Sequence, residues 1–486
     1  MNNIFATLEP KELWSNFGRL NAIPRPSKKE KKVIEFIQAF GNTLSLVTSV
    51  DSAGNVLIRK PASKDMENRT PIILQSHLDM VHQKNADTVF DFDAEGIKMF
   101  IDADWVRAEG TTLGADNGIG VAAIMTILAS KSISHPALEA LFTIDEETGM
   151  TGALSLEPGF LNGKILLNLD TEEDNELTIG CAGGIDITAT GFYDSIPFVA
   201  GSAFTIKLKG LAGGHSGVDI HKGKANANKL MNRTLSEISK QIYLGISFID
   251  GGSLRNAIPR ESVAGIVVES NNENKLKQIL SAIGENFKTE YHFTDPNLTL
   301  TIEPADLPKS LLPEKFQSEF LNVLYACPNG IYRLSPEITG LVQSSNNVAR
   351  VLVKDGIYSV QCLTRSSVDS EKKDLSNAIT AVFELLNGTV TYGGNYPGWE
   401  PKPGAPIVKL MREIYFELFD EEPHVNAVHA GLECGIIGTN YPELQMISFG
   451  PNIYGAHSPD EKVQVSSVQK FWTYLLETLK RIPEKD

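Results

Sequence analysis

"GADNGIGVAAIMTILASKSISHPALEALFTIDEETG", residues 114–149, holds the alternation that decides the fold. A Gly-rich turn leads into an apolar segment of helical length, 117–130, and the apolar run 137–144 follows as a buried strand. The stretches "PIILQSHLDM" (71–80) and "GKILLNLD" (163–170) are strands of the same kind. Apolar strands that alternate with helices are typical of a mainly parallel sheet with helices on both faces.

The pattern changes near residue 185. The stretches "SAFTIKLKGL", "SVAGIVVES" and "LTLTIEP" alternate apolar and polar residues, and helix-like segments separate them, which predicts an α+β region with antiparallel strands. A Gly- and Pro-rich stretch, 391–406, precedes a return to helices around the apolar strand "ELQMISFG". We therefore expect an α/β domain built from residues 1–185 and 398–486, with an α+β domain inserted at 186–397.

Composition narrows the class of protein. At 486 residues the chain is too long for one ordinary core, and its net charge of −16 argues against nucleic acid or an anionic membrane as partner. The N-terminus lacks a secretory pattern, and the longest apolar stretch, 119–130, is shorter than the roughly 20 residues of a membrane span. Four scattered cysteines without a C-x-x-C pair fit a reducing compartment, so we expect a cytoplasmic protein.

Polar residues gather where the predicted strands of the first domain end. The candidates are His77, Asp79, Asp116, Glu146, Glu147, Asp170 and His457. A lone acid at a strand end is usually a turn or a helix cap. However, ligands bind at the carboxyl ends of the strands in an open parallel sheet, so acids and histidines that converge on this edge indicate a site.

The residue types suggest a pair of metal ions. Two histidines and three carboxylates without cysteine suit two divalent ions, with zinc favoured and manganese or cobalt as substitutes. Such a pair activates water in aminopeptidases and related hydrolases. In extended chain His77 and Asp79 point the same way, so Asp79 can orient the imidazole. Adjacent Glu146 and Glu147 should diverge, one towards metal and the other towards water.

Eight motifs, in order along nearly the whole chain, carry a family resemblance. "SHLDMV", "GADNGIG", "DEETGMTGA", "LNLDTEE", "GGHSG", "GGSLRNAIPRE", "HAGLECG" and "HSPDE" resemble those of the M20 metallopeptidases. Within that family the motifs are most similar to those of bacterial dipeptidases that cleave Xaa-His substrates.

The resemblance implies a role for each candidate. His77 and Asp170 would hold one zinc ion, Glu147 and His457 the other, with Asp116 as the bridge and Glu146 as the general base. The inserted domain would be a lid that supplies His215 for the oxyanion, Asn256 as a second polar contact, Arg365 for the substrate carboxylate and Gly431 near that carboxylate. Without the resemblance, His215 reads as a loop residue and Arg365 as half of a surface ion pair. Asp145 receives no role.

The expected activity is metal-dependent hydrolysis of small dipeptides with a free carboxylate. An aminoacylase or a carboxypeptidase of the same family is the alternative, and a non-catalytic peptide-binding relative is a third. The chain lacks a G-x-S-x-G elbow and the G-x-G-x-x-G and Walker spacings, which argues against a serine hydrolase or a nucleotide enzyme. A homodimer is favoured, although the insert is large enough to hold two subdomains that replace a partner.

Overall fold

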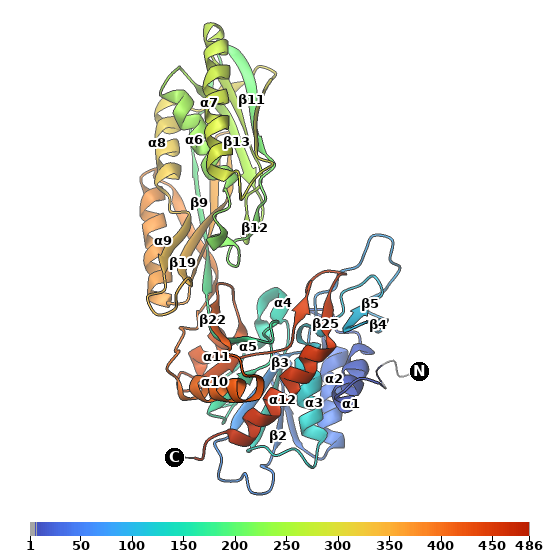
Figure 1. The fold of residues 1–486 in the computed structure, drawn as a ribbon. Helices are drawn as coiled ribbons and strands as arrows, with labels where there is room; N and C mark the ends of the chain where they lie inside the picture. The colour runs from blue at the N-terminus through green and yellow to red at the C-terminus, as the bar shows by residue number, and fades with distance from the viewer. Residues whose placement is uncertain (1–4, 6, 486) are drawn as a thin grey trace. The chain divides into compact units, whose positions relative to one another are not determined.

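The computed structural model describes residue 5 and residues 7–485, which form two compact units (Figure 1). Unit 1 combines the chain up to Gly180 with Trp399–Ala427 and the chain from Leu432 onwards, and unit 2 consists of Cys181–Gly398 and Val428–Gly431. Unit 2 begins slightly before the expected residue 186 because the strand Gly183–Phe192 already pairs within its sheet.

Unit 1 is built on an eight-stranded sheet of order β1-β2-β6-β3-β7-β23-β8-β22. Its strands are β1 (Val47–Val50), β2 (Val56–Lys60), β6 (Leu138–Thr143), β3 (Ile72–His77), β7 (Ile165–Asn168), β23 (Gln445–Ser448), β8 (Glu176–Cys181) and β22 (His424–Val428). The central strands β6, β3, β7 and β23 run parallel, whereas β2 pairs antiparallel with β6, and β8 pairs antiparallel with β23. Every residue of β3, β6 and β7 is buried, so both faces of the sheet are covered. This confirms the expected fold class.

Eight helices belong to the described part of unit 1. They are α1 (Lys11–Asn21), α2 (Lys31–Thr43), α3 (Ala115–Ala129), α4 (Glu146–Gly149), α5 (Thr151–Leu154), α10 (Pro406–Phe419), α11 (Glu433–Asn440) and α12 (Val465–Arg481). Helix α3 packs against both β3 and α1 and is buried on all sides, which explains why its sequence is apolar without a polar stripe. A separate four-stranded sheet joins β24 (Ile453–Tyr454), β25 (Lys462–Gln464), β5 (Trp105–Ala108) and β4 (Met99–Asp102).

Unit 2 contains a sheet whose strands all pair antiparallel. They are β16 (Thr299–Pro304), β11 (Ser202–Lys209), β15 (Ser262–Val268), β13 (Gly245–Gly252), β19 (Val342–Lys354), β20 (Ile357–Ser366), β9 (Gly183–Phe192) and β21 (Thr389–Tyr396), with β18 (Gly330–Leu334) beside β19. Helices α6 (Ala227–Ser239), α7 (Glu273–Tyr291), α8 (Glu314–Ala326) and α9 (Asp369–Glu384) share one apolar core with these strands (Figure 1). In β11, buried Phe204, Ile206 and Leu208 alternate with less buried Thr205 and Lys207, the pattern of a sheet covered on one face.

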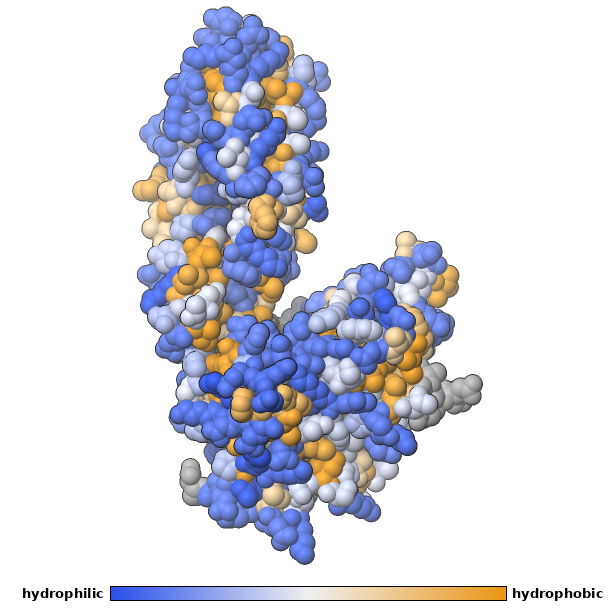
Figure 2. Space-filling view, viewed as in Figure 1, coloured by the Kyte–Doolittle hydropathy of each residue, from blue (hydrophilic) through white to orange (hydrophobic). Residues whose placement is uncertain are grey.

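Short elements complete unit 2. They are the ladders of β10 (Ile196–Pro197) with β17 (Ser310–Leu311) and of β12 (Gly214–His215) with β14 (Ala257–Ile258), and the 3-10 turns Ile220–Lys222 and Ser270–Asn272. The visible face of each unit is mainly hydrophilic, and hydrophobic residues form small patches on it (Figure 2). Among the described residues, no helix has the length and apolar character that crossing a membrane requires.

Candidate functional site

The register of the parallel strands brings the first candidates to one edge of the unit 1 sheet. His77, the last residue of β3, lies opposite Thr143, the last residue of β6. The chain after β6 leads directly into α4, which begins at Glu146. On the other side of β3, strand β7 ends at Asn168, just before Asp170.

Five of the predicted ligands form two overlapping groups at this edge. His77 Nε2 lies 3.1 Å from Asp116 Oδ1 and 3.4 Å from Asp170 Oδ1. His457 Nε2 lies 3.3 Å from Asp116 Oδ2 and 2.9 Å from Glu147 Oε2. In each group the donor atoms lie within 4.8 Å of one another, and Asp116 belongs to both through its two oxygens. Each of the two groups could therefore hold a metal ion.

Burial and charge make the cluster suited to cations. Glu147 Oε1 is buried and has no hydrogen-bond partner among the described residues, a costly condition that a metal ion would relieve. Hydrogen bonds to Asp116 and Glu147 raise the pKa of His457 to about 11. Burial opposes a charge on His77, yet Asp170 and Asp116 raise its pKa well above the ordinary value. The carboxylates thus stabilise positive charge, and the residues present fit divalent metal ions.

Asp79 organises this edge without joining either group. Its carboxylate Oδ1 lies 3.3 Å from His77 Nδ1 and its backbone carbonyl lies 3.2 Å from the same atom, and these contacts orient the ring so that Nε2 faces Asp116. The same carboxylate accepts hydrogen bonds from the backbone amides of Glu146 and Glu147 at 3.0 and 3.3 Å and from the Ser27 hydroxyl at 2.8 Å. Asp79 therefore ties the imidazole of one group to the backbone that carries Glu147 of the other.

Glu146 and Glu147 diverge, as their adjacency predicts. Glu147 reaches His457, whereas Glu146 belongs to neither group. Burial raises the pKa of Glu146 well above its ordinary value, and the charges of Asp170 and Glu147 add to the shift. A carboxyl with a raised pKa beside a candidate metal site is suited to proton transfer.

Asp145, to which the sequence assigns no role, fixes the turn before α4. It has a left-handed backbone with φ 52°, and its side chain is 4% exposed. The carboxylate accepts hydrogen bonds from the hydroxyls of Thr148 and Thr151 and from Lys28 Nζ. Asp145 thus holds the segment that presents both glutamates.

In unit 2, His215 is held with one ring nitrogen as an acceptor. His215 Nδ1 accepts hydrogen bonds from the backbone amides of Gly217 and Val218 at 3.2 and 3.1 Å, so the proton of the neutral ring is on Nε2. Burial and the charge of Arg365 lower the pKa of His215 to about 4. The ring is neutral near pH 7 and offers Nε2–H as a donor. Exposed Asn256 immediately precedes β14, which pairs with β12 and its His215.

Arg365 is the buried cation near His215, contrary to the alternative of a surface ion pair. It is 4% exposed and donates through Nη1 to the Tyr396 hydroxyl at 2.8 Å, while its buried Nε has no hydrogen-bond partner among the described residues. His429 is also buried, and its Nε2 lies 2.7 Å from Ser345 Oγ. Burial and the charge of Arg365 lower the pKa of His429 to about 3. Gly431 lies in the same short segment, Val428–Gly431.

Sequence reasoning missed three buried charged residues of unit 1. Glu433, at the start of α11, accepts hydrogen bonds from Gln75 Nε2 at 2.6 Å and Thr143 Oγ1 at 2.7 Å, and burial raises its pKa to about 8. Arg25 and Glu461 are 1% and 2% exposed. The motifs "HAGLECG" and "HSPDE" contain Glu433 and Glu461, so the sequence could have pointed to both glutamates. For Arg25 the sequence offered only its place between two prolines, in "PRP".

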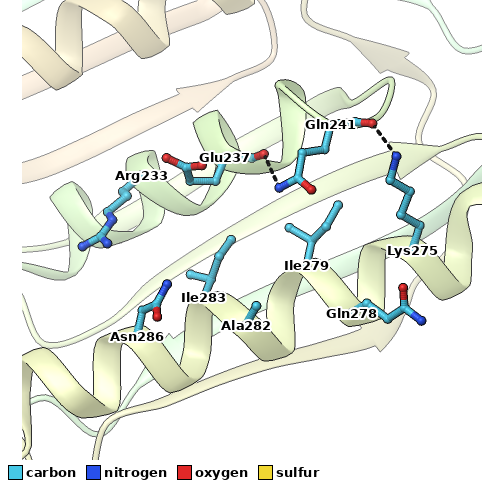
Figure 3. Close-up of a pocket in the computed structure, with 9 residues that line it drawn as sticks. All are labelled: Arg233, Glu237, Gln241, Lys275, Gln278, Ile279, Ala282, Ile283 and Asn286. Atoms are coloured by element: carbon cyan, nitrogen blue, oxygen red, sulfur yellow. Dashed lines mark hydrogen bonds between the residues drawn. The ribbon is translucent and has the colours of Figure 1, made fainter.

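A pocket of about 450 Å³ lies between α6 and α7 of unit 2 (Figure 3). Ile279, Ala282 and Ile283 point from α7 towards α6, and Lys275 Nζ donates to the Gln241 carbonyl at 3.0 Å. Arg233 at its rim is paired with Glu290. The pocket contains none of the predicted site residues.

Comparison with known proteins places the chain in a family. The model of peptidase family M20/M25/M40 matches residues 73–481. The cytosol non-specific dipeptidase of Escherichia coli K12 is 43% identical over 479 residues, which cover 98% of this chain and 99% of that protein. The crystal structure of an aminoacylhistidine dipeptidase from Vibrio alginolyticus covers 99% of both chains at 42% identity, with a TM-score of 0.93.

A more distant structure shares the fold alone. An aminopeptidase from Bacillus cereus is 15% identical, covers 98% of this chain and 99% of its own, and superposes with a TM-score of 0.56. The family match extends over most of the chain, and the two near relatives align with it almost from end to end. This chain therefore belongs to peptidase family M20/M25/M40.

Proposed function

We propose that this protein is a metal-dependent dipeptidase that hydrolyses the peptide bond of dipeptides with a free carboxylate, Xaa-His dipeptides among them. The observation that carries the proposal is the pair of ligand groups that share Asp116. His77 and Asp170 would hold one divalent ion and Glu147 and His457 the other, with zinc favoured because the donors are imidazoles and carboxylates. Two near relatives that align over nearly their whole length are named as dipeptidases, which supports the substrate class.

Divalent ions in such a site lower the pKa of water towards neutrality and polarise a carbonyl. Glu146 accepts the proton from the attacking water while the oxygen bonds to the carbonyl carbon. As the C–N bond breaks, Glu146 passes this proton to the departing nitrogen, which leaves as an amine. The raised pKa of Glu146 makes its carboxyl able both to take up and to return a proton.

For unit 2 we propose substrate binding. The neutral ring of His215 would donate Nε2–H to the oxygen that becomes negative in the transition state, and Asn256 would add a polar contact. Arg365 would bind the substrate carboxylate, with Gly431 close to it. The buried, unpaired Nε of Arg365 supports this role, because a carboxylate accepts two parallel hydrogen bonds from a guanidinium.

The test is the release of free histidine from Gly-His and β-Ala-His. Chelator-treated protein would be assayed with and without added zinc, beside a tripeptide and an N-acetyl amino acid. Zinc-dependent cleavage of the dipeptides alone is the expected result. Cleavage of only the acylated amino acid would indicate an aminoacylase, cleavage of the tripeptide at its C-terminus would indicate a carboxypeptidase, and no cleavage by metal-loaded protein would indicate a binding role.

A homodimer and a cytoplasmic location stay predictions. Sedimentation equilibrium of the full-length protein distinguishes a homodimer from a monomer. We expect a concentration-dependent mass that approaches twice that of the chain.

A further inference from the structure

Glu461, the last residue of the "HSPDE" motif, accepts hydrogen bonds from four consecutive backbone amides. Its Oε2 accepts hydrogen bonds from the amides of Leu113 and Gly114 at 2.6 and 2.9 Å. Its Oε1 accepts from those of Ala115 and Asp116 at 2.7 and 3.3 Å. The carboxylate is thus bound to the loop that carries Asp116, while Glu461 itself follows His457 in the chain.

Arg25 binds the carbonyl oxygens of the same region. Its Nη2 donates to the Gly114 carbonyl at 2.5 Å, and its Nη1 donates to the carbonyls of Leu78 and Asp79, each at 3.0 Å. These last two residues directly follow His77 at the end of β3. Arg25 therefore connects the His77 segment to the Asp116 loop, as Glu461 connects that loop to the His457 segment.

Arg25 and Glu461 are both buried, and their side chains are of opposite charge type. Glu461 accepts hydrogen bonds from the amides of the loop, Arg25 donates to one of its carbonyls, and the charge of Glu461 partly offsets the burial of Arg25. Hydrogen bonds to a charged group are stronger than neutral ones, so the loop is fixed more firmly than ordinary turn contacts would fix it.

We propose that Arg25 and Glu461 are positioning residues that hold His77, Asp116 and His457 in the spacing required by two metal ions. The inference rests on the proposed ligand roles of those three residues. Neither Arg25 nor Glu461 would bind metal or touch substrate. They would act by fixing the backbone of the segments that carry the ligands. Residues that hold metal ligands in place in this way change the affinity of a site for its metal.

The chain offers a matched control far along the sheet from the ligands. Glu139, at the beginning of β6, is a buried carboxylate that accepts hydrogen bonds from the amides of Asn162 and Gly163 at 2.7 and 3.0 Å. Arg59 Nε pairs with it at 2.9 Å. This pair likewise combines an arginine with a buried carboxylate that binds backbone amides, although Arg59 is partly exposed and pairs directly with Glu139. The proposed ligands follow the opposite end of β6.

The experiment compares Glu461→Gln and Arg25→Lys with Glu139→Gln and Arg59→Lys in the full-length protein. Glutamine keeps one acceptor oxygen but turns an NH₂ group towards two amides, and lysine keeps the charge but loses the forked geometry. Chelator-treated proteins would be titrated with Co²⁺, and both the affinity, from competition with a chelator, and the visible spectrum of the bound ion would be recorded.

We expect Glu461→Gln and Arg25→Lys to lose about 10–100-fold in Co²⁺ affinity and to change the cobalt spectrum. In zinc-loaded protein, kcat should fall while KM stays nearly constant. The control variants should lower the melting temperature without changing the spectrum or the affinity. If Glu461→Gln fails to fold, Arg25→Lys still supplies the comparison.

Two outcomes would overturn the inference, and they distinguish failure of the positioning role from failure of the proposed function. Unchanged affinity and spectrum in both site variants, or equal changes in the controls, would reject the positioning role and leave the metal site intact. Failure of the unsubstituted protein to bind Co²⁺ at all would reject the proposed function itself.

Discussion

At the residue scale, Glu146 and Glu147 show how two adjacent carboxylates acquire different chemistry. Both backbone amides donate to Asp79, which fixes the turn at this point. From that anchor Glu147 extends to His457 at 2.9 Å, whereas Glu146 is left buried with its pKa raised well above the ordinary value. The environment of each side chain, and not its type, separates the proposed ligand, Glu147, from the proposed base, Glu146.

We therefore expect Glu146→Gln to keep its metal but to lose roughly 10²–10⁴ in kcat, because glutamine cannot accept a proton. Elemental analysis together with the turnover of metal-loaded protein measures both quantities. The companion change Glu147→Ala should instead lose metal, since it removes a donor of one group. Full turnover by metal-loaded Glu146→Gln would assign the proton transfer to another residue.

At the scale of elements, helix α4 depends on a side chain that precedes it. Asp145 Oδ2 accepts from Lys28 Nζ at 3.0 Å and from Thr151 Oγ1 at 2.7 Å, and its backbone is left-handed with φ 52°. Aspartate and asparagine tolerate that backbone better than other residues with a side chain. The helix that presents Glu146 and Glu147 is thus held by a residue that belongs to neither of the two groups around Asp116.

Asp145→Ala should lower the free energy of unfolding by about 1–3 kcal/mol, because a buried acceptor with several donors is removed. Asp145→Asn keeps an acceptor oxygen and tolerates the left-handed backbone, so its loss should be smaller. Urea unfolding of chelator-treated protein measures the difference. Equal stability of the alanine and unsubstituted proteins would show that Lys28 and the threonines do not depend on Asp145.

The same elements show what a sequence can reveal about a site. Apolar runs give the strands, and the ends of parallel strands share an edge, so the convergence of His77 and Glu147 could be predicted. The positioning role that we propose for Arg25 and Glu461 could not be predicted from the sequence. Glu461 accepts hydrogen bonds from backbone amides and Arg25 donates to backbone carbonyls, and such contacts leave no pattern of residue types in the partner segment. Which residue of the Glu146–Glu147 pair meets His457 likewise depends on backbone angles that spacing alone does not fix.

At the scale of the whole molecule, the lowered pKa of buried His429 links the stability of the chain to pH. His429 is 7% exposed, and its pKa of about 3 is due first to burial and then to the charge of Arg365. In the unfolded chain the pKa of a histidine is about 6.5. Between these two values the unfolded chain binds a proton that the folded chain does not, so folding stability is complete above about pH 6.5 and is lost as the pH falls towards 3.

We expect His429→Gln to reduce the slope of unfolding free energy against pH between 6 and 4 by up to about one proton, because glutamine does not titrate. Urea unfolding at a series of pH values, on chelator-treated protein to exclude metal effects, gives both slopes. His292→Gln is the control for the substitution itself, since His292 is exposed just beyond α7. Identical slopes for His429→Gln and the unsubstituted protein would mean that the buried imidazole takes up its proton without unfolding. In that case the charge of Arg365 would not keep the ring neutral.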